Sequence, residues 1–336
     1  MRCNRVELLQ KLEAVSPGVA KRETIEQSAC FVFKDGKCST FDDEMACTIP
    51  CELGFEGAVA AEKLLTLLGK LAEPEVDVFV KDGKVHVKGS GRGMHFNMEA
   101  KILLPIDSVE PPTTWVPIGE DFLEAVNLVR ECAAIGDAQG FSLSCIHIAQ
   151  GWVEACDNFQ AARYPCATGI RKFALVRAET IRHILSLDMT EQCETRNWLH
   201  YRNPAGLVMS CRKFVEDYPD IAAQFEAGKD ETPTALPKGL VEAVDKAQHA
   251  SSENIENNQV KIELRPGKLR ISAEGLTCGY WEVKETTYDG APIAFMIAPK
   301  LLAEITKKHN ACTLSPGRLR VDGGRFVFVS CLGVVT

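Results

Sequence analysis

The side chains most able to carry out chemistry are 14 cysteines and 7 histidines in a chain of 336 residues. A structural metal site needs thiol or imidazole ligands at close spacing, as in a CxxC pair. No CxxC occurs, and the closest cysteine pair, Cys47 and Cys51, has no second pair or histidine nearby to complete a tetrahedron. We therefore expect no metal and no cofactor, and we interpret the cysteines as small buried apolar residues of a reduced protein.

An enzyme with a cysteine nucleophile is an alternative that these residues leave open. Cys47 or Cys156 could attack an ester or amide if a histidine activated the thiol, but no histidine is placed to do so. The chain also lacks the GxxxxGK[ST] phosphate loop, the HExxH zinc motif and the GxSxG elbow. We predict that the protein is not an enzyme, with a cysteine-dependent hydrolase as a minor alternative.

Two further segments have the composition of ligand sites. Gly89-Ser90-Gly91-Arg92-Gly93 is glycine-rich like a dinucleotide loop, but it follows a hairpin strand instead of opening a helix. Asp42-Asp43-Glu44 could bind a cation, yet the matching positions of two later segments carry turn sequences. Both are interpreted as structural turns.

The composition is that of a folded protein, with 46% hydrophobic and 25% charged residues and a net charge of −8. No apolar stretch approaches the roughly 20 residues that cross a bilayer, and charges interrupt any signal-peptide core near the N-terminus. We expect a cytoplasmic protein with no membrane contact. The acidic total argues against nonspecific coating of nucleic acid, although a local basic face remains compatible with it.

An internal repeat determines where the candidate residues lie in the fold. One helical pattern opens at Leu8, Phe122 and Leu240, and a second recurs near Lys63, Glu179 and Lys300. Both patterns return about every 115 to 120 residues, as a tandem array requires. Each helix is followed by a hairpin, whose turns lie at 34–37, 149–152 and 266–268 after the first helix and at 81–84, 203–206 and 316–318 after the second.

Proline-rich linkers at 110–114 and 230–237 separate the repeats, and we expect neither to form a strand or a helix. The fold class predicted is α+β, with three domains at 1–114, 115–232 and 233–336 in which two helices pack on antiparallel sheet.

The second helices have an amphipathic pattern. Leu64, Leu65, Leu68 and Leu71 form an apolar stripe opposite Lys63, Thr66 and Lys70. The third repeat places Lys300 and Lys307 similarly, and Arg130, Arg182 and Lys246 occupy comparable polar faces. This recurrence predicts a basic face, against the alternative that these side chains only solvate their helices.

The repeat and several local strings resemble the bacterial sliding clamp, the beta subunit of DNA polymerase III. Lys21-Arg22-Glu23-Thr24 resembles the loop after the family's first helix, and Asp43-Glu44-Met45 resembles its DLEM-type string. Phe214–Asp220, with Leu104–Asp107 as its first-domain counterpart, is similar to the FPDY signature, and Tyr288-Asp289-Gly290 to the YSG string.

The resemblance implies three tandem clamp domains in a ring-forming homodimer that encircles duplex DNA without reading its sequence. Such a ring is a processivity factor that tethers a replicative polymerase and is placed on DNA by a clamp loader. The residues expected on its DNA-facing inner surface are Arg22, Lys63, Lys70, Arg130, Arg182, Lys246, Lys300 and Lys307. The alternative within this resemblance is a clamp-like interaction scaffold that does not close on DNA.

The resemblance also implies a cleft that takes short Gln-Leu-x-Leu-Phe-like peptides from polymerase and loader. The matching positions are Cys156, Asn158, Phe159, Gln160, Ala161, Pro219, Ala223, Gln224, Ser330, Leu332 and Val334. The family's Gly-His-Arg-Leu is replaced here by Asn158–Ala161, and its Met-Pro-Met-Arg-Leu tail by Leu332–Thr336. These departures predict an altered peptide preference.

Overall fold

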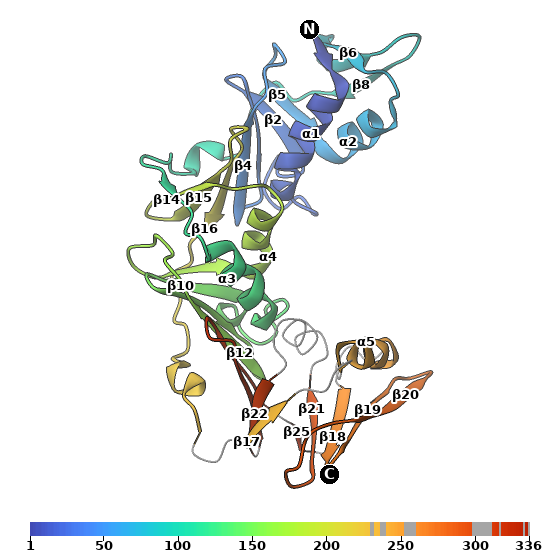
Figure 1. The fold of residues 1–336 in the computed structure, drawn as a ribbon. Helices are drawn as coiled ribbons and strands as arrows, with labels where there is room; N and C mark the ends of the chain where they lie inside the picture. Colours follow the sequence, from blue (N-terminus) through green and yellow to red (C-terminus); the bar gives the residue numbers. More distant parts are fainter. Residues whose placement is uncertain are drawn as a thin grey trace. The chain divides into compact units, whose positions relative to one another are not determined.

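The computed structural model describes residues 1–228, 232–235, 240–251, 260–297, 311–315, 317–331 and 333–334. Contacts divide the chain into two units (Figure 1). Unit 1 comprises Met1–Leu123, Ile148–Gln150 and Ala167–Glu216. Unit 2 comprises Glu124–His147, Gly151–Cys166 and Asp217–Thr336.

The helices of unit 1 are α1 (Arg5–Val15), α2 (Ala61–Lys70) and α4 (Ala178–Ile181), which continues as the 3-10 turn Arg182–Leu185. Asn4 begins α1 because its side-chain oxygen accepts hydrogen bonds from the backbone N–H groups of Val6 and Glu7. On α2, Leu64 and Leu68 are buried while the lysines are exposed, as the periodicity predicted.

Two antiparallel sheets complete unit 1. One has the order β1-β6-β7-β8 and the other the order β5-β2-β3-β4-β16-β15-β14-β9. The strands of the unit are β1 (Arg2–Asn4), β2 (Cys30–Lys34), β3 (Lys37–Phe41), β4 (Met45–Pro50), β5 (Gly57–Ala60), β6 (Glu75–Lys81), β7 (Lys84–Lys88), β8 (Gly93–Asn97), β9 (Val116–Pro117), β13 (Ala174–Arg177), β14 (Glu191–Glu194), β15 (Trp198–Arg202) and β16 (Val208–Arg212).

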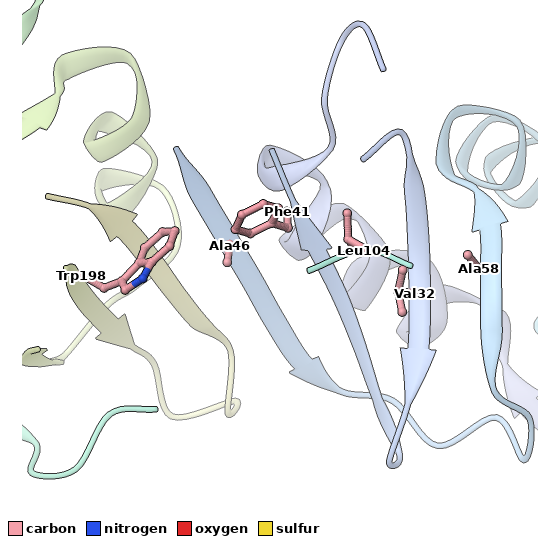
Figure 2. Close-up of a cluster of buried hydrophobic side chains, with 6 residues drawn as sticks. All are labelled: Val32, Phe41, Ala46, Ala58, Leu104 and Trp198. Atoms are coloured by element: carbon pink, nitrogen blue, oxygen red, sulfur yellow. The ribbon is translucent and has the colours of Figure 1, made fainter. Parts of the chain in front are cut away.

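The pairing of β4 with β16 joins strands of the first and second repeats into one sheet. Phe41 and Trp198 pack across this join with ring centres 6.2 Å apart, in the buried cluster drawn in Figure 2. Glu44 accepts a 3.1 Å hydrogen bond from Arg177 Nε, and Asp43 pairs with Arg212. The Asp42-Asp43-Glu44 run is therefore structural, as predicted.

His200 on β15 predicts how stability depends on pH. Its Nδ1 lies 2.8 Å from Ser210 Oγ and its Nε2 3.0 Å from Thr195 Oγ1, and burial lowers its pKa to about 4 from the usual 6.5. As the pH falls, His200 therefore takes up a proton in the unfolded chain before it does so in the folded chain. The contribution of neutral His200 to the free energy of unfolding is complete above pH 6.5 and is lost as the pH falls towards 4. Between pH 7.5 and pH 4 we expect the free energy of unfolding of the wild type to fall by about 3 kcal/mol relative to His200→Gln.

Urea denaturation of both proteins at each pH measures this difference. Burial raises the pKa of Asp42 to about 6, so this carboxyl titrates in the same range with the opposite sign, but it is present in both proteins and cancels. A difference that stays constant with pH would show that His200 is not the responsible group.

A second eight-stranded sheet contains in succession β10 (Cys145–Ala149), of which Cys145–His147 belong to unit 2, and the unit 2 strands β11 (Trp152–Cys156), β12 (Gln160–Pro165), β24 (Val327–Cys331), β23 (Arg318–Asp322), β22 (Ala311–Ser315) and β17 (Thr232–Ala235). The helix α3 (Phe122–Val129) leads into the 3-10 turn Arg130–Cys132, and a second 3-10 turn, Ala222–Phe225, follows the second repeat.

A five-stranded sheet of order β20-β19-β18-β21-β25 forms the rest of unit 2. Its strands are β18 (Val260–Arg265), β19 (Lys268–Glu274), β20 (Gly279–Glu285), β21 (Ile293–Ile297) and β25 (Gly333–Val334). The helix α5 (Leu240–Ser251) packs on β18, β19 and β20 through Ala243, Val244 and Ala247, which are fully buried. Among the described residues, no helix is long and apolar enough to cross a membrane.

The structure confirms the predicted hairpins and five of the six predicted helices. The sixth, near Lys300, lies outside the described residues. The prediction that the 230–237 linker forms no strand was wrong, because Thr232–Ala235 pairs with β22 as strand β17. Pro233 is tolerated there because β17 is the last strand of its sheet. Pro117 is tolerated in β9 for the same reason. The domain boundaries 1–114, 115–232 and 233–336 stay a prediction.

Candidate functional site

A pocket of about 350 Å³ opens on the surface of unit 2. Three segments far apart in the sequence form its walls: the β11–β12 turn, the 3-10 turn at 222–225, and the β22–β23 turn with the end of β24. Its lining consists of Cys156, Asp157, Asn158, Phe159, Gln160, Ala161, Ile221, Gln224, Gly317, Arg318, Val329, Ser330 and Cys331.

The β11–β12 turn has a fixed shape because Asp157 organises it. Asp157 Oδ1 accepts hydrogen bonds from the backbone N–H groups of Phe159 at 2.7 Å and Gln160 at 2.8 Å. Cys331 N donates to Phe159 O at 2.6 Å, which joins the turn to β24. The turn leaves the Phe159 ring 55% exposed at the pocket rim. A large apolar side chain is thereby left accessible at the surface.

The floor of the pocket is apolar. Cys156, Ala161, Ile221 and Val329 belong to one buried cluster together with Phe225. Amide and hydroxyl side chains surround this floor, and the basic residue of the pocket lining is Arg318. An apolar floor with a polar rim suits a short peptide that inserts one or two apolar side chains and is oriented by hydrogen bonds.

The 222–225 wall is held by arginines of β23. The Arg318 guanidinium donates to the carbonyl oxygens of Gln224 and Glu226, and Arg320 Nε donates to Phe225 O at 3.3 Å. These bonds attach the segment around the 222–225 turn, which connects the second repeat to the third, to the sheet without strand pairing. The pocket therefore depends on side chains of the third repeat.

A buried charged group supports the same wall from β11 and β12. The Glu154 side chain is 3% exposed and accepts hydrogen bonds from Arg163 Nε at 2.7 Å, with His147 Nδ1 at 2.9 Å. The Arg163 guanidinium lies 4.7 Å from the ring centres of both Trp152 and Phe225. Phe225 therefore stacks on a cation that is itself fixed by a buried carboxylate.

Tyr218 fastens the start of the connecting segment. Its ring centre lies 4.7 Å from that of His147, and its hydroxyl donates to Cys156 Sγ at 3.3 Å. Burial raises the pKa of Tyr218, so this hydroxyl keeps its proton and its donor role at neutral pH.

Comparisons with known proteins bear on the fold. No protein-family model and no curated protein matches the sequence. The structure is similar over its whole length to the DnaN sliding clamp (DNA polymerase III subunit beta) of Pseudomonas aeruginosa bound to griselimycin, with a TM-score of 0.80, 16% identity, and 100% of this chain and 99% of that chain covered. The chain has the sliding-clamp fold.

Other solved clamps give the same result. The DNA polymerase III beta chain of Streptococcus pneumoniae has a TM-score of 0.80 at 14% identity, and that of Thermotoga maritima 0.79 at 13% identity. In both cases 100% of this chain and 99% of that chain are covered. The predicted α+β clamp fold is confirmed.

Within this clamp fold, seven of the residues predicted for a peptide cleft line the pocket: Cys156, Asn158, Phe159, Gln160, Ala161, Gln224 and Ser330. Pro219 and Ala223 are not in its lining, Leu332 lies outside the described residues, and Val334 is described only as a backbone partner of Phe295 in β25. Their role in binding stays a prediction.

Six lining residues of the clamp pocket were not predicted: Asp157, Ile221, Gly317, Arg318, Val329 and Cys331. The Pro316-Gly317-Arg318 turn was visible as a hairpin signal, but the pairing of β12 with β24 that brings it to the pocket was not. Ile221 followed directly on the Phe214–Asp220 string and carried no signal of its own.

The basic residues predicted to face DNA have different surroundings in the clamp fold. Arg22, Lys63 and Lys70 of unit 1 are exposed. Arg130 pairs with Glu131 at 2.7 Å, Arg182 with Glu179 at 2.8 Å and Lys246 with Glu282 at 3.5 Å. Lys300 and Lys307 lie outside the described residues. The contact of these residues with DNA stays a prediction.

The cysteine nucleophile finds no support in the surroundings of either candidate. Burial raises the pKa of Cys47 to about 12 and also raises that of Cys156. Both groups are thus protonated at neutral pH, whereas the thiolate is the reactive form. None of the 14 cysteines forms a disulfide, and no group of three or more metal-binding side chains occurs among the described residues.

Proposed function

We propose that the protein is a DNA sliding clamp, a homodimeric ring that encircles duplex DNA in the cytoplasm and tethers a replicative polymerase. The observation that carries this proposal is the full-length likeness to bacterial DNA polymerase III beta subunits. The clamp has no catalytic role in this proposal and needs no cofactor, because retention follows from topology alone.

Two edge strands of the part of the chain that the structure describes, β8 and β20, support closure of a ring. β8 ends the four-stranded sheet of unit 1, and β20 ends the five-stranded sheet of unit 2. On β20, Trp281 is 66% and Val283 51% exposed. An exposed edge with apolar side chains is a template for pairing with another chain. In the proposed dimer, β20 of each copy pairs with β8 of the other, which removes both edges.

Long-range electrostatics explains how an acidic protein can hold DNA. Scattered lysines and arginines on the inner surface attract phosphates without reading bases, so the ring can slide. The acidic residues that give the chain its net charge of −8 then lie mostly on the outer surface of the ring, where they repel DNA. Polymerase and clamp loader, in this proposal, bind the unit 2 pocket through short peptide motifs.

Charge reversal at Arg22, Lys63 and Lys70 tests the DNA-facing assignment. We expect the triple glutamate variant to lose at least tenfold in retention on nicked circular DNA at 0.1 M salt, because three exposed phosphate contacts become repulsive. Its mass in light scattering should be unchanged. Retention is measured by gel filtration after loading, before and after the circle is cut, and a clamp that survives linearisation contradicts a topological grip.

Phe159→Asp tests the peptide pocket, with Phe173→Asp as a matched control because both rings are 55% exposed. We expect the first variant to weaken binding of an acetylated Gln-Leu-Ser-Leu-Phe peptide, or of the partner polymerase, at least tenfold, since a charge then stands at the rim of an apolar floor. Fluorescence anisotropy measures the affinity. Equal losses in both variants would place the binding site elsewhere.

A further inference from the structure

Three aromatic rings stand in a row across β6, β7 and β8. Phe79 is directly opposite His86, and His86 is directly opposite His95 in the antiparallel register. The ring centres of Phe79 and His86 are 5.1 Å apart with the planes at 5°, and those of His86 and His95 are 5.6 Å apart at 36°. No function described above uses the two imidazoles.

The spacing of the imidazoles suits one shared metal ion. A metal–nitrogen bond of about 2.0–2.1 Å puts each ring centre about 3.2 Å from the metal, so two ligands at 90–109° have ring centres about 4.5–5.2 Å apart. The observed 5.6 Å needs only a small rotation of the side chains. Phe79 stacks on His86 and limits how far that ring can turn away.

The charged neighbours indicate which metals fit. Lys88 Nζ lies 5.6 Å from the Phe79 ring centre, Asp77 is opposite Lys88, and Lys84 precedes His86 by two positions on β7. Lys81 is opposite Lys84 on the same face, so three lysines against one carboxylate disfavour a cation held by charge alone, such as Mg²⁺ or Ca²⁺. Zn²⁺, Ni²⁺ and Cu²⁺ bind imidazole through coordination and overcome this.

We infer that His86 and His95 form a two-imidazole site for a transition-metal dication, with the remaining coordination positions open to water. Because β8 is the last strand of its sheet, the metal joins an edge strand to its inner neighbour and holds it in register. The site lies within unit 1, on the strand β8 that pairs with β20 of a second copy in the proposed ring.

Calorimetric titration of Ni²⁺ and Zn²⁺ tests this site. Cys278 and Cys331 are exposed thiols that would also bind these metals, so the full-length protein is used as native chain and as the Cys278→Ser/Cys331→Ser variant. We expect a site with a micromolar Kd at pH 7.5 to be present in both proteins, and to be the one site of the double serine variant.

Single variants separate this site from the other histidines. His86→Ala and His95→Ala should each weaken binding at least tenfold, whereas His183→Ala, on the 3-10 turn 182–185, should not. Circular dichroism of the metal-free variants checks the fold. An affinity unchanged in His95→Ala, or equal binding of Mg²⁺, would overturn the inference.

Discussion

Replacing Trp281 and Val283 together by glutamate is expected to convert the proposed dimer of about 74 kDa into a monomer of 36.9 kDa. Both side chains are more than half exposed on the edge strand β20, where the proposed ring closes. Two carboxylates per interface would have to be buried against the partner strand, and unpaired charges are expensive to desolvate. Multi-angle light scattering at micromolar concentration measures the mass, and retention on circular DNA should be lost with the dimer.

Ile135→Glu is the control for this pair, because Ile135 is 90% exposed but lies in a loop of unit 2 outside every strand. It should stay dimeric. A double variant that remains a dimer would show that β20 is not the closing edge. A wild-type protein that is monomeric at the same concentration would favour the alternative of an interaction scaffold that does not close on DNA.

Arg163→Met will have the largest effect on stability, about 3–5 kcal/mol. The substitution removes a guanidinium that donates to Glu154, whose side chain is 3% exposed, and so leaves a buried carboxylate with His147 alone. It also removes the cation on which Phe225 stacks, so the 222–225 wall of the pocket should loosen. Chemical denaturation measures the first effect, and hydrogen exchange of residues 217–226 measures the second.

The double variant Arg163→Met/Glu154→Gln is the matched control, because it removes the unpaired charge while keeping the shape. We expect it to regain at least half of the lost stability, with Arg163→Met less stable than the double variant. If the single and double variants are equally stable, the buried carboxylate does not cause the loss.

Local sequence determined most of the secondary structure, for reasons that act over a few residues. The Asp35-Gly36 and Asp82-Gly83 pairs adopt positive φ at both positions, 51° and 70° in the first and 50° and 70° in the second. Only two-residue turns with positive φ join two short strands without forcing the strands apart, so these hairpins were predictable. The helices followed from the spacing of leucines, since burial of one face is a local requirement.

The fold as a whole was predictable because three copies of one pattern reinforced each other. A single helix such as α2 indicates little, but the same order of helix and hairpin three times restricts the architectures to a few. Proline misled this reasoning at Thr232–Ala235, because whether a strand lies at an edge depends on which strands surround it.

The chain sequence by itself determined the elements, their order and the residues with apolar faces. Tertiary structure alone decided the pocket and the histidine pair, because both depend on which strands meet and in what register. Gln160 lies opposite Ser330 only because β12 pairs with β24, and His86 meets His95 only because the register of β7 and β8 sets them face to face. Which distant strands pair depends on how much apolar surface the whole sheet buries, and a short stretch of sequence does not reveal that total.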